Sequence, residues 1–370
     1  MRHRKCRVLY RAAILLTLIV GAGSGMILLL RNIPAIAGFL DWGTDEPSEY
    51  TQETQAPPAQ VPLMVLSRGY GFKEELDPTE PQTEHANAES QDTGPKPYPQ
   101  TWDLTGGEVH PVTYSAYSGE PYINLQKAGQ VLNKTSVEND TLYTESKLRP
   151  AIKIELNGEP QVLIMHTHTT ETYEPCERQY YDASFNYRTT DSSKNMVMVG
   201  DAITRKLEAA GVGVIHDTTI HDYPSYTGSY GRSGETVQKI LAEYPSIKVV
   251  LDIHRDAISQ SGIISQPVAE IGGRNAAQVM IISGCDDGTM GMPHYMENFR
   301  FACLLQQQLE SDYPGLTRPI LFDYRKYNQH LTTGSLLIEV GSHGNTLEQA
   351  EYAGELIGAS LARALKGMAH

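Results

Sequence analysis

The most constraining feature of this chain is a run of 19 residues, 12–30, that contains no ionisable side chain. A helix of this length spans the ~30 Å hydrocarbon core of a bilayer. Basic residues precede the run and the first acid is Asp41, so the positive-inside rule predicts a cytoplasmic segment 1–11 and an extracytoplasmic remainder. A small-x-small motif at 35–37 makes a cleavable signal peptide the alternative, but the run exceeds the usual ~7–15 apolar residues. The sequence therefore favours a retained single-pass transmembrane helix.

Residues 31–100 are predicted to form a disordered, acidic linker. The part from 41 to 100 holds 12 acids against three bases and is rich in Pro, Glu, Thr, Gln and Ser. Such a stretch buries too little apolar surface to offset the entropy that it would lose on ordering. The composition becomes globular from about residue 101. We divide this part into an N-terminal extension, 101–160, and a catalytic domain, 161–370.

Charge and cysteine content argue against two classes of protein. The whole chain has a formal net charge of −14, and its acidic ectodomain lacks a Lys/Arg cluster. Nucleic-acid binding needs charge that neutralises phosphates, so nucleic acid is not an expected partner. Four scattered cysteines without a C-x-x-C pair do not make a disulfide scaffold. One bridge among Cys176, Cys285 and Cys303 stays open as an alternative.

Short β-branched runs alternate with helical patterns beyond residue 160. Strands are predicted at 161–165, 212–215, 248–253, 278–283 and 335–340, and helices at 195–210, 234–243, 297–310 and 346–365. This order predicts an α/β fold with a mostly parallel sheet that helices cover on both faces. Ligands of such sheets bind beyond the carboxyl ends of the strands.

Polar side chains gather at three of these strand ends, at 166–171, 254–256 and 339–343. A single histidine after a buried strand is more often a hydrogen-bonded structural residue. Three coincident ends with imidazoles and carboxylates instead favour a catalytic zinc site, which needs three protein ligands and an open position. A further carboxylate nearby would serve as general base for the attacking water.

Other catalytic chemistries have weaker support. Ser335 and Ser342 lack a G-x-S-x-G elbow, and Cys176 has no papain-type surroundings. A glycosidase would need two carboxylates about 5–10 Å apart beside a groove, and it would leave the histidines without a role.

Several long blocks resemble stage II sporulation protein P of endospore-forming bacteria, over about residues 110–365. Among them are VLIMHTHTTETY (162–173), VVLDIHRDAI (249–258) and YNQHLTTGSLLIEVGSHGNTLEQA (327–350). The resemblance implies a membrane-anchored peptidoglycan hydrolase with N-acetylmuramoyl-L-alanine amidase and cross-link endopeptidase activities. It also implies a fold similar to the zinc amidases and a place in the intermembrane space at the sporulation septum. Stage II sporulation proteins D and M are the partners that it suggests for septal thinning and engulfment.

The resemblance also assigns the metal site residue by residue. His168 and His254 match the two histidine ligands of Zn²⁺, and Glu339 matches the general base. The third ligand departs from the amidase pattern, because Asp191 stands where the amidases have a glutamate. An aspartate ahead of the helix at 195 is equally suited to an N-cap role. Glu171 and Glu297 are the alternatives.

Four further residues complete the expected site. Arg255 and Asp256 are expected to orient His254 or to contact the substrate. His166 is expected to support a ligand from behind, and His343 to be structural or to face the substrate. The rival interpretation from another class is a non-catalytic wall-binding or scaffold protein that uses the same groove.

Overall fold

The computed structural model describes residues 94–369. The predicted cytoplasmic segment 1–11, the transmembrane helix 12–30 and the linker up to residue 93 lie outside the described residues. Within 94–369, no helix combines the length and the apolar character that crossing a bilayer requires.

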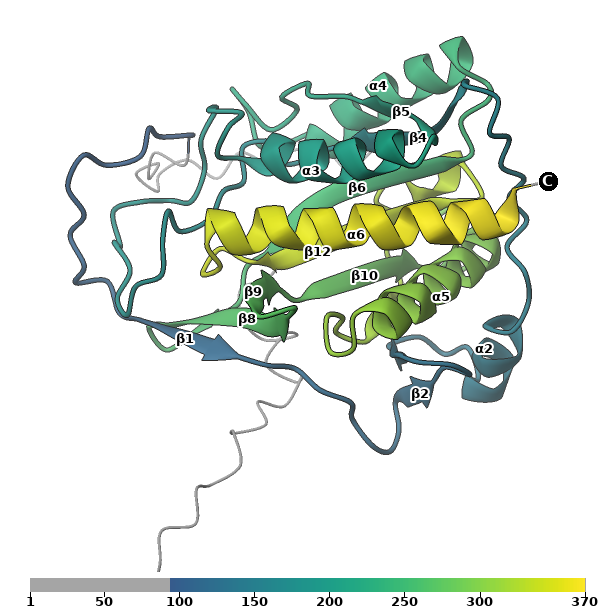
Figure 1. Ribbon diagram of the computed structural model, residues 1–370, viewed down its shortest axis with the longest axis horizontal. Coiled ribbons are helices and arrows are strands. Elements are labelled where there is room, and N and C mark those ends of the chain that lie inside the picture. The colour runs from purple at the N-terminus through teal and green to yellow at the C-terminus, as the bar shows by residue number, and fades with distance from the viewer. Residues whose placement is uncertain (1–93, 370) are drawn as a thin grey trace, which may run out of the picture. The chain divides into compact units, whose positions relative to one another are not determined.

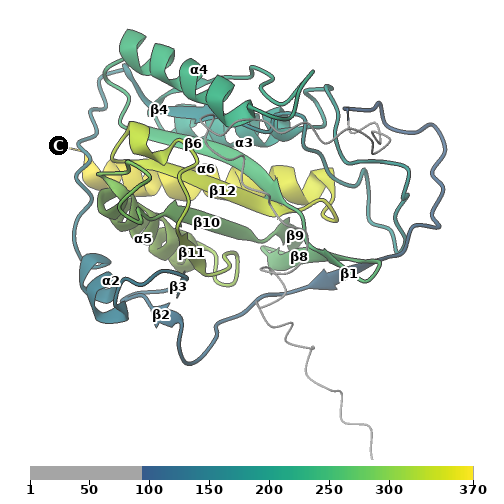
Figure 2. The same ribbon diagram turned by 180° about the vertical axis from the view of Figure 1, so that it is seen from behind.

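An eight-stranded sheet lies at the centre of the fold, in the order β2-β3-β11-β10-β12-β6-β4-β5 (Figures 1 and 2). The strands are β2 (Tyr122–Asn124), β3 (Gln130–Asn133), β4 (Pro160–Met165), β5 (Gly213–His216), β6 (Val249–Asp256), β10 (Val279–Gly284), β11 (Ile320–Asp323) and β12 (Ser335–Ser342). The five strands predicted from β-branched runs are confirmed. The short strands β2, β3 and β11 were not predicted.

A smaller sheet contains four strands that were not predicted. They are β1 (Glu108–Val112), β7 (Ser259–Gln260), β8 (Ile263–Ile271) and β9 (Arg274–Ala277). β8 pairs with the other three, in parallel with β1 and antiparallel with β7 and β9. Three of these strands belong to the connection between β6 and β10.

The main sheet is mixed, so the prediction of a mostly parallel sheet was wrong. β12, β6, β4 and β5 are mutually parallel. β10 is antiparallel to β12, and β11 and β3 follow the direction of β10. The reason is the connection after β6. Its strands β7, β8 and β9 lie at the end of the sheet where β6 terminates, so the chain enters β10 from that same end and β10 runs antiparallel to β6.

Helices cover both faces of the main sheet, as predicted, but unequally. The helices are α2 (Asn139–Glu145), α3 (Met196–Ala209), α4 (Ser229–Glu243), α5 (Tyr295–Asp312) and α6 (Leu347–Met368), with a 3-10 turn η2 (Gln329–Leu331). Figure 1 shows α3, α6 and α5 in front of the sheet, and Figure 2 shows α4 on the opposite face. α4 begins five residues before its predicted start at 234.

Alternation along the strands separates two layers of core. Ile253 and Ile338 belong to the large apolar cluster beneath α3, α5 and α6. Val250 packs with Val237 of α4 on the other face, and Leu337 lies in a further cluster with Tyr327. Residues that follow Ile253 and Ile338 therefore face the α4 side of the sheet.

The region before residue 161 is part of the same fold. It supplies β2 and β3 at one edge of the main sheet and β1 to the smaller sheet. Upstream of them, Tyr98 donates a hydrogen bond to the Tyr173 carbonyl and packs edge-on against Phe185. The three described cysteines are free: Cys176 is exposed, and Cys285 and Cys303 are buried.

Candidate active site

The three polar strand ends meet, because β4, β6 and β12 are neighbours in the main sheet. Glu339 of β12 is the register partner of His254 of β6. The two side chains therefore lie on the same face of the sheet, the face that α4 covers. Gly341 has φ +63° in the bulge that ends the regular pairing after Glu339, a conformation that favours glycine.

His168, in the loop after β4, approaches His254 edge-on, with 5.2 Å between the ring centroids. Its Nε2 lies 3.0 Å from the Tyr226 hydroxyl, whose ring stacks on the imidazole at 4.5 Å. Its Nδ1 is buried and has no hydrogen-bond partner among the described residues. Burial lowers the pKa of His168 well below its ordinary value, so the neutral ring has a lone pair free for a ligand.

His254 lies between two carboxylates. Its Nδ1 is 3.7 Å from Glu171 Oε2, and its Nε2 is 2.8 Å from Asp252 Oδ1. The contact with Asp252 is an ion pair whose angles do not meet those of a hydrogen bond. Burial opposes the charge on His254, but the carboxylates of Asp252, Glu171 and Glu339 together outweigh burial and raise the pKa of His254 to about 9. Asp252 is itself fixed by the amide and hydroxyl of Thr167. The imidazole is thus held from behind and turned toward Glu171.

Glu339 is buried, and its Oε2 has no hydrogen-bond partner among the described residues. Burial and the negative charge of Asp256 raise its pKa to about 8, against the opposing effect of His254. A carboxyl group with a pKa near neutrality can both accept and return a proton at physiological pH. This is the property that the predicted general base requires.

The raised pKa of Glu339 predicts that the free energy of unfolding of the metal-free protein decreases as the pH rises. Because the folded pKa of about 8 exceeds the unfolded value, the contribution to stability is complete below about pH 4.5 and is lost as the pH rises through 8. Glutamine at this position does not ionise, so the Glu339→Gln variant does not lose this stability as the pH rises. We expect the difference in melting temperature between Glu339→Gln and wild type to grow between pH 5 and pH 8, in chelator, and then to level off. A constant difference, or an equal trend in the exposed control Glu159→Gln, would contradict the assignment.

Glu171 is the carboxylate that the structure brings to the histidines. It is buried, its Oε2 accepts a hydrogen bond from the Arg255 amide, and it faces His254. Asp191 is placed elsewhere: its side chain is 42% exposed and is bound by Lys194 and by the Ser193 hydroxyl. The N-cap of α3 is instead Asn195, whose side chain accepts a hydrogen bond from the Val197 amide. Asp191 therefore does not cap α3, and its part as a metal ligand stays a prediction.

Glu297 lies at the opposite end of the sheet. Its neighbour Asn298 accepts a hydrogen bond from the amide of Ser335, the first residue of β12. Glu339 is four residues further along the strand, about 13 Å away at ~3.3 Å per residue. The reversed direction of β10 carries the start of α5 to this end.

Arg255 and Asp256 support the site through the surrounding backbone. The Arg255 guanidinium donates to the carbonyls of Thr172 and Tyr187, and it lies 3.9 Å from Glu171. It thus fixes the loop that carries Glu171. Asp256 pairs with the fully buried Arg318 at 2.9 Å.

The two remaining predicted histidines are both buried and neutral. His166 contacts the Ile253 carbonyl and His216, and burial together with His216 lowers its pKa to about 3. It supports β6 directly before His254. His343 packs edge-on against Tyr187, and burial lowers its pKa to about 3 as well.

Sequence reasoning missed Asp252 and the two tyrosines beside His254, Tyr230 and Tyr327. Asp252 stands two residues before His254 on a strand, and this spacing places both on one face. Tyr230 of α4 stacks on Tyr327 at 5.1 Å and lies parallel to the His254 ring at 6.4 Å. No sequence signal marked these tyrosines, because they come from α4 and from the loop before η2.

Comparison with known proteins identifies the family. The sequence model of the stage II sporulation protein P family matches residues 73–362. The chain belongs to this family. Stage II sporulation protein P of Bacillus subtilis (strain 168) is 26% identical over 261 residues, which are 68% of this chain and 62% of that protein. The resemblance seen in the sequence is therefore confirmed, and His168, Glu171, His254 and Glu339 all lie within the range that matches the stage II sporulation protein P family.

Solved structures similar to this stage II sporulation protein P family member include two amidases. One is the N-acetylmuramyl-L-alanine amidase of Mycobacterium smegmatis, at 11% identity and a TM-score of 0.35, covering 57% of this chain and 99% of that one. Another is the N-acetylmuramoyl-L-alanine amidase of Clostridium difficile 630, at 15% identity and a TM-score of 0.34, covering 57% of this chain and 97% of that one.

Proposed function

We propose that this chain is a zinc-dependent peptidoglycan hydrolase that cleaves the N-acetylmuramoyl-L-alanine amide bond during sporulation. Peptide cross-links are a second candidate substrate. The observation that carries the proposal is the meeting of His168, His254 and Glu171 beside Glu339 at the ends of three adjacent strands. Membership of the stage II sporulation protein P family supplies the sporulation context.

The donor atoms at this place fit zinc. Two imidazoles and one carboxylate are a usual ligand set for a catalytic zinc ion. The unpartnered Nδ1 of His168 and the Asp252 carboxylate behind His254 match how zinc-binding histidines are presented and oriented. No three His, Cys, Asp or Glu side chains within 94–369 are already arranged to hold a metal ion. Ion binding would therefore draw His168 and Glu171 toward His254.

Each residue has a distinct part in the proposed reaction. When bound, zinc supplies Lewis-acid activation of the amide carbonyl and of water. Glu339 accepts the proton of the attacking water and returns it to the leaving amine nitrogen. Asp252 and the Thr167 contacts keep the His254 ring in place, and Arg255 keeps Glu171 in place.

The rim of the site suits a glycan strand. Tyr223 and Tyr226, 48% and 42% exposed, lie in the loop before α4, and the Tyr226 ring stacks on His168. The loop is held rigidly, because Asp222 pairs with Arg188 at 2.8 Å and Arg232 donates to the carbonyls of Ser225 and Thr227. Exposed aromatic rings on a fixed loop can pack against the apolar faces of sugar rings.

The same proposal includes location and partners. The residues before 94 would anchor the chain with its N-terminus in the cytoplasm and its catalytic region in the space between the septal membranes. Stage II sporulation proteins D and M are the proposed partners. These points rest on the sequence pattern at 12–30 and on the family.

Metal analysis of the purified protein, combined with mass spectrometry of digested sacculi, tests the function. We expect one zinc ion per chain, and products that separate muramic acid from peptides with a free L-alanine amine. Binding to sacculi without any released product would instead support a wall-binding or scaffold protein. Full activity in a zinc-free protein would contradict the metal assignment.

A comparison of three isosteric variants tests the third ligand. We expect Glu171→Gln to weaken zinc binding by about 10-fold or more, because it removes an anionic donor beside His254. Asp191→Asn and Glu297→Gln should bind zinc as wild type does, and they serve as matched controls for the loss of one carboxylate. Zinc titration of all three, with thermal melting to check folding, is the measurement. Loss of zinc in Asp191→Asn alone would restore the assignment made from the sequence.

A further inference from the structure

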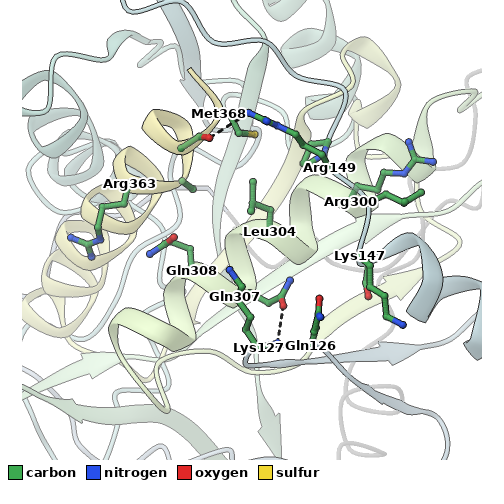
Figure 3. A pocket seen from close by; sticks show the side chains of 15 residues that line it. Gln126, Lys127, Lys147, Arg149, Arg300, Leu304, Gln307, Gln308, Arg363 and Met368 are labelled. Atoms are coloured by element: carbon green, nitrogen blue, oxygen red, sulfur yellow. Dashed lines mark hydrogen bonds between the residues drawn. The ribbon is translucent and has the colours of Figure 1, made fainter. Parts of the chain in front are cut away.

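A pocket of about 300 Å³ lies between α5, the end of α6, the β2–β3 connection and the segment after α2 (Figure 3). α5 and α6 cover the face of the main sheet opposite to α4. Since His254 and Glu339 face the α4 side, the pocket and the candidate active site lie on opposite sides of the sheet.

The lining of this pocket is strongly basic. Of its 15 residues, five are cationic and none is acidic: Lys127, Lys147, Arg149, Arg300 and Arg363. The chain as a whole carries a net charge of −14, so a lining with five cations runs against its overall charge balance. The five cations are spread along the sequence, and only the fold gathers them. Figure 3 shows Arg149, Arg300 and Lys147 on one side of Leu304 and Arg363 on the other.

Internal ion pairs account for only two of the five charges. Arg300 pairs with Glu145 at 2.6 Å, and Arg363 pairs with Asp312 at 2.7 Å. The contacts of Lys127, Lys147 and Arg149 within 94–369 include no salt bridge. Lys147 lies over the Tyr143 ring, and Arg149 makes a long contact of 3.4 Å to the Gly367 carbonyl. Three cationic groups are thus available to an anionic ligand.

Apolar side chains project from the same rim. Leu148, between Lys147 and Arg149, is 45% exposed, and Tyr143 is 38% exposed. Basic groups around a small pocket, with a protruding leucine and tyrosine, match the chemistry of an anionic bilayer surface: phosphate headgroups, glycerol backbone and the start of the acyl region. Lys and Arg both bind phosphate, and Tyr is enriched at this depth of the bilayer.

We propose that this pocket binds the phosphate headgroup of an anionic lipid and docks the folded region on the membrane through the rim formed by Tyr143, Lys147, Leu148 and Arg149. The active-site face then points away from the bilayer. The 93 residues that precede Gly94 include the proposed anchor, which would keep the chain at the same membrane. The lipid contact does not depend on the proposed hydrolysis.

Hydrogen–deuterium exchange of the full-length chain in lipid nanodiscs tests the docking. With phosphatidylglycerol in the nanodiscs, we expect the backbone at 146–150 and 363–368 to exchange about threefold more slowly than in purely zwitterionic nanodiscs. The triple variant Lys127→Gln, Lys147→Gln, Arg149→Gln should lose this protection. The matched control Arg205→Gln, Lys239→Gln, Arg274→Gln removes the same charge elsewhere and should retain it. Higher salt should weaken the protection, because exposed charges are screened.

Three outcomes would overturn the proposal. They are equal exchange in the two kinds of nanodisc, retained protection in the first triple variant, and loss of protection in the control. Soluble glycerol 3-phosphate is the probe for a site that takes free phosphate: protection by it alone, with none on anionic nanodiscs, would overturn membrane docking. Digestion of soluble peptidoglycan fragments should be unchanged in the first triple variant, so a failed docking result leaves the proposed reaction separately testable.

Discussion

Glu339→Gln is expected to lower the turnover of peptidoglycan by about 10²-fold or more while zinc content stays normal. Glutamine keeps the size of the side chain but cannot accept the proton of the attacking water. The residue is buried, and its Oε2 has no hydrogen-bond partner among the described residues, so the substitution breaks no hydrogen bond at that atom. The measurement is the initial rate of muropeptide release at saturating sacculi, together with metal analysis of the same preparation.

The control for Glu339→Gln is Glu171→Gln. Both variants remove one buried carboxylate near His254, but the second is expected to lose zinc and the first is not. Unchanged turnover in Glu339→Gln would place the base elsewhere. Loss of zinc in Glu339→Gln would instead make Glu339 a ligand, and Glu171 would become the candidate base.

The positions of the main strands and helices could be predicted because each has a strong local pattern. Strand β6 begins with the apolar residues Val249, Val250 and Leu251, and α3 is an amphipathic segment that stops before Gly211. The direction of β10 could not be predicted, since a β-branched run indicates a strand but not whether that strand pairs in parallel or antiparallel. It depends on the strands β7, β8 and β9, whose sequence mixes Gln, Ser, Glu and Pro with apolar residues and gives no such pattern.

The candidate site could be predicted where it depends on strand ends. The three polar strand ends follow from sequence motifs, and they meet because β4, β6 and β12 are neighbours; the choice of His168, His254 and Glu339 within them came from the family resemblance. The choice between Asp191 and Glu171 could not be made from spacing, because it depends on how the loop between β4 and α3 folds back. That loop pairs Glu171 with Arg188 as a bridge and leaves Asp191 at its exposed turn.

His168→Ala and His254→Ala are each expected to release the metal and to reduce digestion of sacculi by about 10³-fold or more, because each change removes a proposed zinc ligand and not only an orienting contact. The two residues come from different segments, the loop after β4 and the strand β6. A shared effect on zinc would therefore reflect one joint site. Metal analysis and muropeptide release are the measurements, with near-ultraviolet circular dichroism to check that the fold persists.

The exposed residue His110 supplies the control, since His110→Ala removes an imidazole far from the metal ligands in sequence and should change neither zinc content nor rate. Asp252→Asn makes the test sharper. It keeps His254 but takes away the carboxylate 2.8 Å behind its Nε2, so zinc affinity should fall by about 10- to 100-fold while the ligand set is intact. If both alanine variants kept stoichiometric zinc, the metal would have to lie elsewhere in the chain and the mechanism proposed here would fail.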